Sequence, residues 1–360
     1  MIYEYTHGGD VYDANGFADK NMPDFSASIN PLGMPESALT AARQSLDLSC
    51  VYPDSGCRRL VTALAAYENV SPQYLFCSNG ASDIIFRIVS AKKPKKILVT
   101  APSFSDYERA GRGAGAEIVY YPLQKENGFN IDDGITEAIR AALPDIVFLC
   151  NPNNPTGSLT RNDLLTEVAA VCADIGSVLT VDECFLDFLL ESNQLSAKSL
   201  LGLYANVVVL KAFTKIFAMP GLRLGYVICK NEAFIDRLRL CGADWPVSNV
   251  AQAAGLAALE NGADYISNSI EYIDTERKRL SEALAGMGLV VYPSYANFIF
   301  FYCPWYVNLA EELRKKGILI RDCSNFAGLT SGYYRIAVLT EEKNTRLIES
   351  LNSVSGRHAR

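Results

Sequence analysis

The chain has 360 residues, 49% of them hydrophobic and 20% charged, which is the composition of a globular protein and excludes a disordered chain. Lys and Arg number 33 against 40 Asp and Glu, and the formal net charge of -7 gives no overall basic field for nucleic acid or an anionic membrane. At this length we expect one large domain or two medium ones.

The first thirty residues lack the features of a targeting segment. They contain five acids and no apolar core, so we expect neither a signal peptide nor a transit peptide. No window approaches eighteen consecutive apolar residues, and we therefore expect a cytoplasmic protein without membrane partners. The ten cysteines are scattered without a CxxC pair, and His7 and His358 are the only histidines, so we predict reduced thiols and no metal site.

The central part of the chain alternates short β-branched runs with helical patterns. The runs predicted as strands lie at 75–78, 96–101, 117–123, 145–151, 177–183, 207–213 and 224–229. This alternation predicts a mostly parallel sheet with helices on its faces. The continuous apolar run at 146–149 suits a sheet that is covered on both sides.

The remainder of the chain predicts a second, smaller unit. Helical spacing over 251–287 indicates one or two long helices, and beyond it four apolar runs alternate with helical patterns. The loop-like N-terminal arm, through Pro35, is expected to join this unit. The predicted boundaries are 45–250 for the large domain, and 1–44 together with 251–360 for the small domain.

Chemically informative residues follow three of the predicted strands: Asp182, Asn154 and Lys215. Ligands of open α/β sheets bind at the carboxyl ends of the strands, so we expect these side chains at one edge of the sheet. Taken singly, Asp182 and Asn154 also suit ordinary turns. Their order and spacing as a group have no such structural explanation.

Lys215 lies among apolar residues with no acid within four positions. A surface lysine is the ordinary alternative. The constrained turn at 219–225 follows, however, and brings a second cation, Arg223. Burial and a nearby cation lower the pKa of a lysine, which is the form that makes imines with carbonyl compounds.

Gly80, Ala81 and Ser82 follow the first predicted strand and open an apolar helical run. The free N–H groups at such a helix N-terminus form a suitable cup for a phosphate, although a simple capped helix start explains the pattern equally well. Asp83 would repel a phosphate unless its carboxylate is turned away. With the lysine amine, the carboxylate and the arginine, this cup completes what pyridoxal phosphate requires.

The motifs at 153–157, 182–183, 214–215 and 221–225 resemble the signature of the fold-type I pyridoxal-phosphate-dependent aminotransferases, and the resemblance extends over essentially the whole chain. It implies an α/β fold: an aminotransferase-like three-layer α/β/α large domain with a mostly parallel sheet, and a smaller α/β domain. It also implies pyridoxal 5'-phosphate as cofactor and a homodimer with shared active sites.

The resemblance implies a role for each matching residue. Lys215 would form the imine with the cofactor, Asp182 would pair with the pyridine nitrogen, and Asn154 would bond the ring hydroxyl. The full set of cofactor-binding residues implied is Gly80, Ala81, Ser82, Tyr107, Asn154, Asp182, Thr214, Lys215, Arg223 and, from the other subunit, Tyr52. Tyr107 matches the aromatic residue that stacks on the ring, with a core tyrosine as the alternative.

Within this family the sequence resembles two branches with phosphorylated substrates, the histidinol-phosphate aminotransferases and the threonine-phosphate decarboxylases of cobalamin biosynthesis. The arm at 7–10 and 24–33, and the segments 321–326 and 333–337, are similar to the decarboxylase branch. Phe185 stands where the aminotransferase branch typically has a tyrosine. Cys184 in place of Ala, and Lys211 in place of Arg, are departures that we expect to leave the cofactor site intact.

An anionic substrate suits the remaining residues. Arg335 would clamp the α-carboxylate in a bidentate fork, and Arg321 with His7 and the amides of Gly8 and Gly9 would bind a substrate phosphate. Asn30 is expected to help place the substrate. For His7, an exposed mobile terminus is the alternative.

Decarboxylation of L-threonine O-3-phosphate is therefore the predicted reaction, with three alternatives left open. These are a histidinol-phosphate or aromatic aminotransferase, a decarboxylase that prefers O-phosphoserine, and a cofactor-binding regulatory module without catalysis. A Rossmann dehydrogenase is excluded because Gly111, Gly113 and Gly115 lack the GxGxxG spacing and precede a strand. That glycine cluster is predicted to be a helix-to-strand turn.

Overall fold

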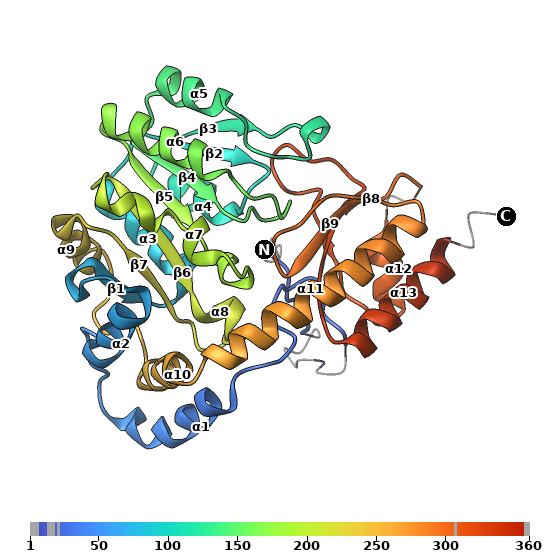
Figure 1. Ribbon diagram of the computed structural model, residues 1–360, viewed down its shortest axis with the longest axis horizontal. Helices are drawn as coiled ribbons and strands as arrows, with labels where there is room; N and C mark the ends of the chain where they lie inside the picture. Colours follow the sequence, from blue (N-terminus) through green and yellow to red (C-terminus); the bar gives the residue numbers. More distant parts are fainter. Residues whose placement is uncertain (1–6, 13–18, 20–21, 306–307, 356–360) are drawn as a thin grey trace.

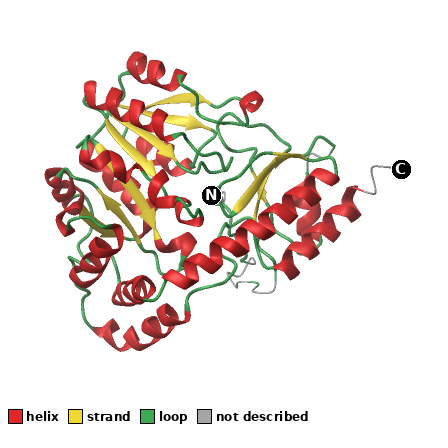
Figure 2. Cartoon of the chain, in the orientation of Figure 1, coloured by secondary structure: helices red, strands yellow, loops and turns green. Residues whose placement is uncertain are grey.

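A seven-stranded sheet forms the centre of the larger part of the molecule (Figures 1 and 2). The computed structural model describes residues 7–12, 19, 22–305 and 308–355. The strand order is β1-β7-β6-β5-β4-β2-β3, and β7 alone runs antiparallel to its neighbours in this sheet. The strands are β1 (Leu75–Ser78), β2 (Lys96–Ala101), β3 (Glu117–Pro122), β4 (Ile146–Cys150), β5 (Val178–Asp182), β6 (Val207–Ala212) and β7 (Gly225–Ile228). The seven predicted strands are thus confirmed to within one residue at each end.

Helices cover both faces of this sheet, which confirms the three-layer α/β/α prediction. Alternate residues of β4 separate into two cores: Val147 and Leu149 face one helical layer, and Ile146 and Phe148 face the other. The first layer contains α1 (Glu36–Gln44), α2 (Arg58–Glu68), α5 (Gly134–Ala142), α6 (Asn162–Asp174) and α10 (Asn249–Glu260). The second contains α3 (Gly80–Lys92), α4 (Ser105–Gly113) and α9 (Glu232–Leu240).

A smaller antiparallel sheet, of order β10-β11-β9-β8, lies in the C-terminal part of the chain. Its elements are β8 (Val290–Val291), β9 (Phe298–Tyr302), β10 (Arg321–Asp322) and β11 (Tyr333–Ala337), with α12 (Leu309–Lys315) and α13 (Glu341–Ser355). The predicted smaller α/β unit is therefore present. Two short helices of four residues each are α7 (Ser192–Leu195) and α8 (Phe213–Ile216). Short 3-10 turns occur at 45–50, 72–74, 125–127, 186–188 and 197–202.

The 24-residue helix α11 (Ala263–Gly286) connects the two parts (Figure 1). Its Ile273 packs in the core of the large sheet, whereas Leu280 and Leu284 pack in the core of the small one. The N-terminal arm joins the small sheet as expected, because Phe25 is fully buried in that second core. The predicted domain boundaries stay a prediction, and α1 and α10 pack in the core of the large sheet.

Gly111, Gly113 and Gly115 span the end of α4 and the turn into β3, which confirms the predicted helix-to-strand turn. Among the described residues, no helix combines the length and the apolar character that a membrane span requires.

A buried ionic cluster ties β6 to α2 on the face of the large sheet away from α3. The Lys211 amine lies 3.2 Å from the Glu68 carboxylate and 2.7 Å from that of Asp187, and Lys198 and Tyr226 also donate to Glu68. Burial raises the pKa of Glu68, but the two ammonium groups outweigh it and hold this pKa at about 2. Lys211, in place of the usual arginine, therefore has a structural role here.

Glu68→Gln is expected to destabilise the fold by about 3 kcal/mol at pH 7, because it removes one partner of a buried ion pair. The folded pKa of about 2 lies below the usual value of 4.5, so this stabilisation is present above pH 4.5 and is lost as the pH falls toward 2. Urea unfolding at pH 7 measures the destabilisation, and its comparison with unfolding at pH 4 measures the part of the stabilisation that is lost on acidification. As a control, Glu311→Gln removes an exposed partner of Lys315 and should change the unfolding free energy by less than about 0.5 kcal/mol. Equal stability of wild type and Glu68→Gln at pH 7 would contradict this account.

Candidate active site

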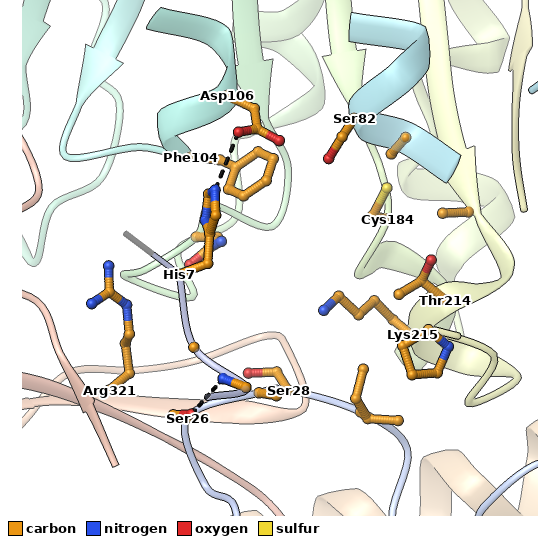
Figure 3. Close-up of a pocket in the computed structure, with 18 of the residues that line it drawn as sticks. His7, Ser26, Ser28, Ser82, Phe104, Asp106, Cys184, Thr214, Lys215 and Arg321 are labelled. Carbon is orange, nitrogen blue, oxygen red and sulfur yellow. Dashed lines mark hydrogen bonds and ion pairs between the residues drawn. The ribbon is translucent and has the colours of Figure 1, made fainter. Parts of the chain in front are cut away.

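A cavity of about 840 Å³ opens where the carboxyl ends of the central strands face the N-terminal arm and the small sheet (Figure 3). Twelve of the sixteen predicted site residues line it, from both sheets and the arm. They are His7, Gly8, Gly9, Ala81, Ser82, Asn154, Asp182, Thr214, Lys215, Arg223, Arg321 and Arg335. The sequence-distant segments that were expected at one edge of the sheet therefore do meet.

Lys215 extends its amine into this cavity from α8, the short helix that follows β6 (Figure 3). The amine lies 5.5 Å from the centre of the Phe185 ring, and within the described residues no carboxylate lies at ion-pair distance from it. Burial, reinforced by the positive charges of Arg335 and Arg223, lowers the pKa of Lys215 to about 8. A large fraction of this amine is thus neutral and nucleophilic near physiological pH.

Asp182 ends β5 and supplies a buried acceptor to the same cavity. Its Oδ2 accepts a hydrogen bond from the Tyr107 hydroxyl at 2.7 Å, and its Oδ1 accepts one from the Cys184 amide at 3.0 Å. Burial raises the pKa of Asp182 above its usual value. A protonated ring nitrogen placed against this carboxylate would remove that cost by supplying a counter-charge.

The N-terminus of α3 forms a close pocket with Arg223. Gly80 has a φ of +82°, and a Cβ at this position would lie 2.8 Å from an Arg223 guanidinium nitrogen. Glycine therefore permits the guanidinium to lie against the first turn of a thirteen-residue helix. The Asp83 carboxylate is held by Arg87 at 2.7 Å and by the Ser78 hydroxyl, so it is engaged away from this pocket. An anion of phosphate size has helix N–H groups and a guanidinium available here.

Arg335 lies on β11 and is 6% exposed. Its two terminal nitrogens donate to the Asn154 side-chain oxygen and, at 2.7 Å, to the Ser26 carbonyl, whereas its Nε has no hydrogen-bond partner among the described residues. Arg335 also forms no ion pair with a carboxylate of the described residues. Burial lowers the pKa of Arg335 to about 10. A buried guanidinium without a counter-ion is a strong site for a carboxylate ligand.

Arg321 and His7 also line the cavity. Arg321 lies on β10 directly across from Arg335 on β11. It donates to the Asp322 carbonyl at 2.7 Å and to the Asn325 side chain at 2.8 Å, and its guanidinium lies over the Phe326 ring. His7 reaches Asp106 with 3.3 Å between Nε2 and Oδ1 (Figure 3). Two arginines from neighbouring strands and an imidazole thus line one cavity.

Four predicted site residues do not line the cavity. The Tyr107 ring is fully buried, stacks on Phe148 at 4.8 Å and bonds Asp182, so the predicted stacking role is wrong for Tyr107; Phe104 lines the cavity from the same segment. The Asn30 amide donates to the Ile216 carbonyl and the Ser269 hydroxyl, both at 2.8 Å. Asn30 therefore braces the helix of Lys215, and its role toward a substrate stays a prediction.

The other two predicted site residues that do not line the cavity are Gly80 and Tyr52. Gly80 makes room for Arg223, as described above. Tyr52 is 78% exposed and stacks on Trp245 with 4.3 Å between ring centres, so its predicted role toward a second subunit stays a prediction. The amide of Gly9, predicted to bind a phosphate, donates to the Ser26 hydroxyl at 2.8 Å.

Sequence reasoning missed several residues that line the cavity: Ser26, Ser28, Phe104, Asp106, Cys150 and Phe326. Two of them had a usable signal. Phe104 and Asp106 follow β2 just as Asn154 follows β4, so the strand-end rule points to them also.

The donor set fits pyridoxal 5'-phosphate. Lys215 is the available amine for its aldehyde, and Asp182 is the buried acceptor for its ring nitrogen. Ser82, Thr214 and Arg223 surround the glycine-opened helix terminus where its phosphate would be held.

Loading of the cofactor-free protein with pyridoxal phosphate is expected to accelerate with pH around a midpoint near 8, because only the neutral Lys215 amine attacks the aldehyde. The fraction of protein modified after borohydride trapping, followed by mass spectrometry from pH 6.5 to 9.5, measures this rate. A free lysine peptide, with a pKa near 10.4, is the control. A loading rate that still rises about tenfold per pH unit up to pH 9.5, without levelling off, would contradict the lowered pKa.

Comparison with known proteins agrees with this site. The family described as Aminotransferase class I and II matches residues 20–351. A threonine-phosphate decarboxylase from Salmonella typhimurium is 35% identical over 98% of this chain and 97% of its own length. A histidinol-phosphate aminotransferase from Caldanaerobacter subterraneus subsp. tengcongensis is 31% identical over 98% of each chain.

The fold is likewise shared with solved structures. The crystal structure of the histidinol-phosphate aminotransferase from Clostridium acetobutylicum has a TM-score of 0.86 and 31% identity, and the match covers 93% of this chain and all of that one. The donor set of the cavity and these matches identify pyridoxal 5'-phosphate as the cofactor. The chain is therefore an enzyme of the pyridoxal-phosphate-dependent superfamily and belongs to the aminotransferase class I and II family.

Proposed function

We propose that this enzyme decarboxylates L-threonine O-3-phosphate to (R)-1-aminopropan-2-yl phosphate, a step of cobalamin biosynthesis in the cytoplasm. The observation that carries the proposal is a pair of arginines, Arg335 and Arg321, which line one cavity from neighbouring strands, with His7 of the arm lining it as well. A phosphorylated amino acid carries two anionic groups, a carboxylate and a phosphate, that suit two guanidinium groups. The similarity to the Salmonella typhimurium threonine-phosphate decarboxylase supports the same choice.

Each residue has a task in this reaction. Arg335 binds the α-carboxylate, exchanging its present bond to Asn154 for the ligand, and so orients the carbon–carbon bond that breaks. Arg321 and His7 hold the substrate phosphate. The cofactor, when bound, supplies an electron sink for the pair left at the α-carbon as carbon dioxide departs. Lys215, whose pKa is near 8, delivers the proton that replaces the carboxylate.

A histidinol-phosphate aminotransferase is the second candidate, supported by the relatives at 31% identity. It would use the same phosphate anchor, and Arg335 would bind the carboxylate of an amino-acid or oxo-acid partner. Serine phosphate differs from threonine phosphate by one methyl group, which is worth about 1–3 kcal/mol of discrimination.

The deciding experiment supplies the cofactor-loaded enzyme with O-phosphothreonine, O-phosphoserine, and histidinol phosphate plus 2-oxoglutarate. Carbon dioxide released from O-phosphothreonine without any oxo acid is the expected result. Glutamate formed from 2-oxoglutarate, with no carbon dioxide, would replace the proposal by the aminotransferase. Faster release of carbon dioxide from O-phosphoserine than from O-phosphothreonine would mean that the reaction is decarboxylation but that the preferred substrate is O-phosphoserine.

Arg335→Lys is expected to lower kcat/KM for the phosphorylated amino acid about a hundredfold, because a lysine cannot reproduce the two-pronged contact with the carboxylate. The control substrate is the same amino acid phosphate as its α-amide, which lacks the carboxylate charge. Binding of this amide, measured from the absorbance of the bound cofactor, should differ little between wild type and Arg335→Lys. An equal loss for both ligands would place the carboxylate elsewhere.

We also propose a homodimer in which Tyr52 reaches the cofactor phosphate of the other subunit. Tyr52 and Trp245 form an exposed aromatic pair, and Val51 beside them is 55% exposed. Large apolar groups gathered at the surface are typical of a protein interface. The molecular mass in solution, measured by sedimentation equilibrium, tests the dimer.

A further inference from the structure

Asp106 is a buried acid that lines the cavity and has no part in the reaction described above. It lies in the first turn of α4, is 3% exposed, and faces the N-terminal arm (Figure 3). Its Oδ1 receives no well-aligned hydrogen bond from any described residue. A buried carboxylate oxygen in this position requires a counter-charge nearby.

The nearest cation is the imidazole of His7, with 3.3 Å between Nε2 and Oδ1, and Arg109 follows at 4.0 Å. Burial raises the pKa of Asp106, but His7 and Ser82 outweigh it and hold this pKa below its usual value. The carboxylate is therefore ionised at neutral pH. An ionised carboxylate at this distance attracts an imidazole N–H and so fixes the orientation of the ring.

We propose that Asp106 is a positioning residue that fixes His7 at the wall of the cavity, where it binds the substrate phosphate. The inference rests on the proposed function in taking that phosphate as the partner of His7. The His7 ring also packs against Phe104, with 5.6 Å between ring centres, so two neighbours on one segment fix its place. The arm is thereby attached to the wall that carries the cofactor site.

Other charged groups surround His7 at greater distance. They are Asp10 and Asp24 on the arm, Arg109 on α4, Glu311 and Arg314 on α12, and Arg321 and Asp322 on β10. Four are acids and three are arginines, so their charges nearly balance. Within the described residues, Asp106 alone forms an ion pair with the ring. Its removal should thus change the placement of His7 more than the removal of any of these other groups.

The first measurement uses the small number of histidines in the chain, His7 and His358. Protein labelled with ¹³C at histidine Cε1 gives two signals, which His358→Asn assigns. In the cofactor-loaded enzyme, Asp106→Asn is expected to move the His7 signal toward that of a free histidine peptide, and Asp106→Glu to restore most of the difference. Glu108→Gln, on the same helix and paired with Arg112 at 2.6 Å, should leave the signal unchanged.

The second measurement titrates inorganic phosphate into the same samples at pH 7.5 and follows binding by isothermal titration calorimetry. Asp106→Asn should weaken phosphate binding about tenfold, and with the proposed substrate it should raise KM by a similar factor while kcat stays within twofold. In the background of His7→Gln, Asp106→Asn should have no further effect on either value. This double-variant comparison holds even where the single variant is less stable.

An unchanged His7 signal in Asp106→Asn overturns the proposal, as does undiminished phosphate binding. Additive effects of His7→Gln and Asp106→Asn overturn it too, because the two residues would then act independently. These readouts need no turnover. Failure of the proposed function, seen as no carbon dioxide from any phosphorylated amino acid, is thus a separate result.

Discussion

Lys215→Ala is expected to abolish covalent attachment of the cofactor and to lower the rate of the proposed decarboxylation at least about 10⁴-fold. Two physical contributions are lost together, the amine that bonds the aldehyde and the base that moves the proton at the α-carbon. The cavity supplies no substitute, because the other lysine on this edge of the sheet, Lys211, is locked between Glu68 and Asp187. Borohydride trapping followed by peptide mass spectrometry detects the attachment directly.

The matched control is Lys230→Ala, an exposed lysine just after β7. This variant should retain the trapped cofactor and the full rate. A Lys215→Ala protein that still yields a borohydride-fixed peptide would show that another amine holds the cofactor. Retained absorbance with no fixed peptide would instead mean noncovalent binding, which the phosphate pocket at Gly80 and Arg223 permits.

Periodicity made the central fold predictable from the sequence. The strands of the large sheet are short, apolar and buried on both faces, so a run such as 146–149 has few alternatives once helical patterns flank it. Lys215, Asp182 and Asn154 were found for the same reason: a strand end is visible in the sequence, and parallel strands bring their ends to one edge. The direction of β7, antiparallel to both neighbours, has no comparable local signal.

Side-chain direction was the part that the sequence could not supply. Tyr107 and Phe104 are three residues apart at the start of α4, and either suits a stacking role by type. Packing distinguishes the two residues. The Tyr107 ring stacks on Phe148 and its hydroxyl donates to Asp182, whereas Phe104 lines the cavity. The amide of Asn30 shows the same limit, since the sequence does not reveal that it donates to Ile216 and Ser269.

Asp182→Asn is expected to lower the decarboxylation rate about a thousandfold while leaving the cofactor covalently attached. A charge pair at about 4 Å with an effective dielectric constant near 20 is worth roughly 4 kcal/mol, and each 1.4 kcal/mol is tenfold in rate. The asparagine keeps the size of the side chain and can still accept from the Tyr107 hydroxyl. Only the charge that keeps the ring nitrogen protonated is removed. The single-turnover rate and the absorption spectrum of the bound cofactor measure the effect.

Glu183→Gln provides an unusually close control, because this buried carboxylate is the next residue in the chain and points away from the cavity. It accepts hydrogen bonds from the Ser196 hydroxyl and the Ala197 amide, both at 2.7 Å, and burial raises its pKa to about 7. Its replacement should leave the cofactor spectrum and the rate nearly unchanged. Equal losses in the two variants would mean that both act through the packing of β5. A loss confined to Asp182→Asn means that the charge itself is required, since of these two carboxylates Asp182 lines the cavity that Lys215 enters and Glu183 does not.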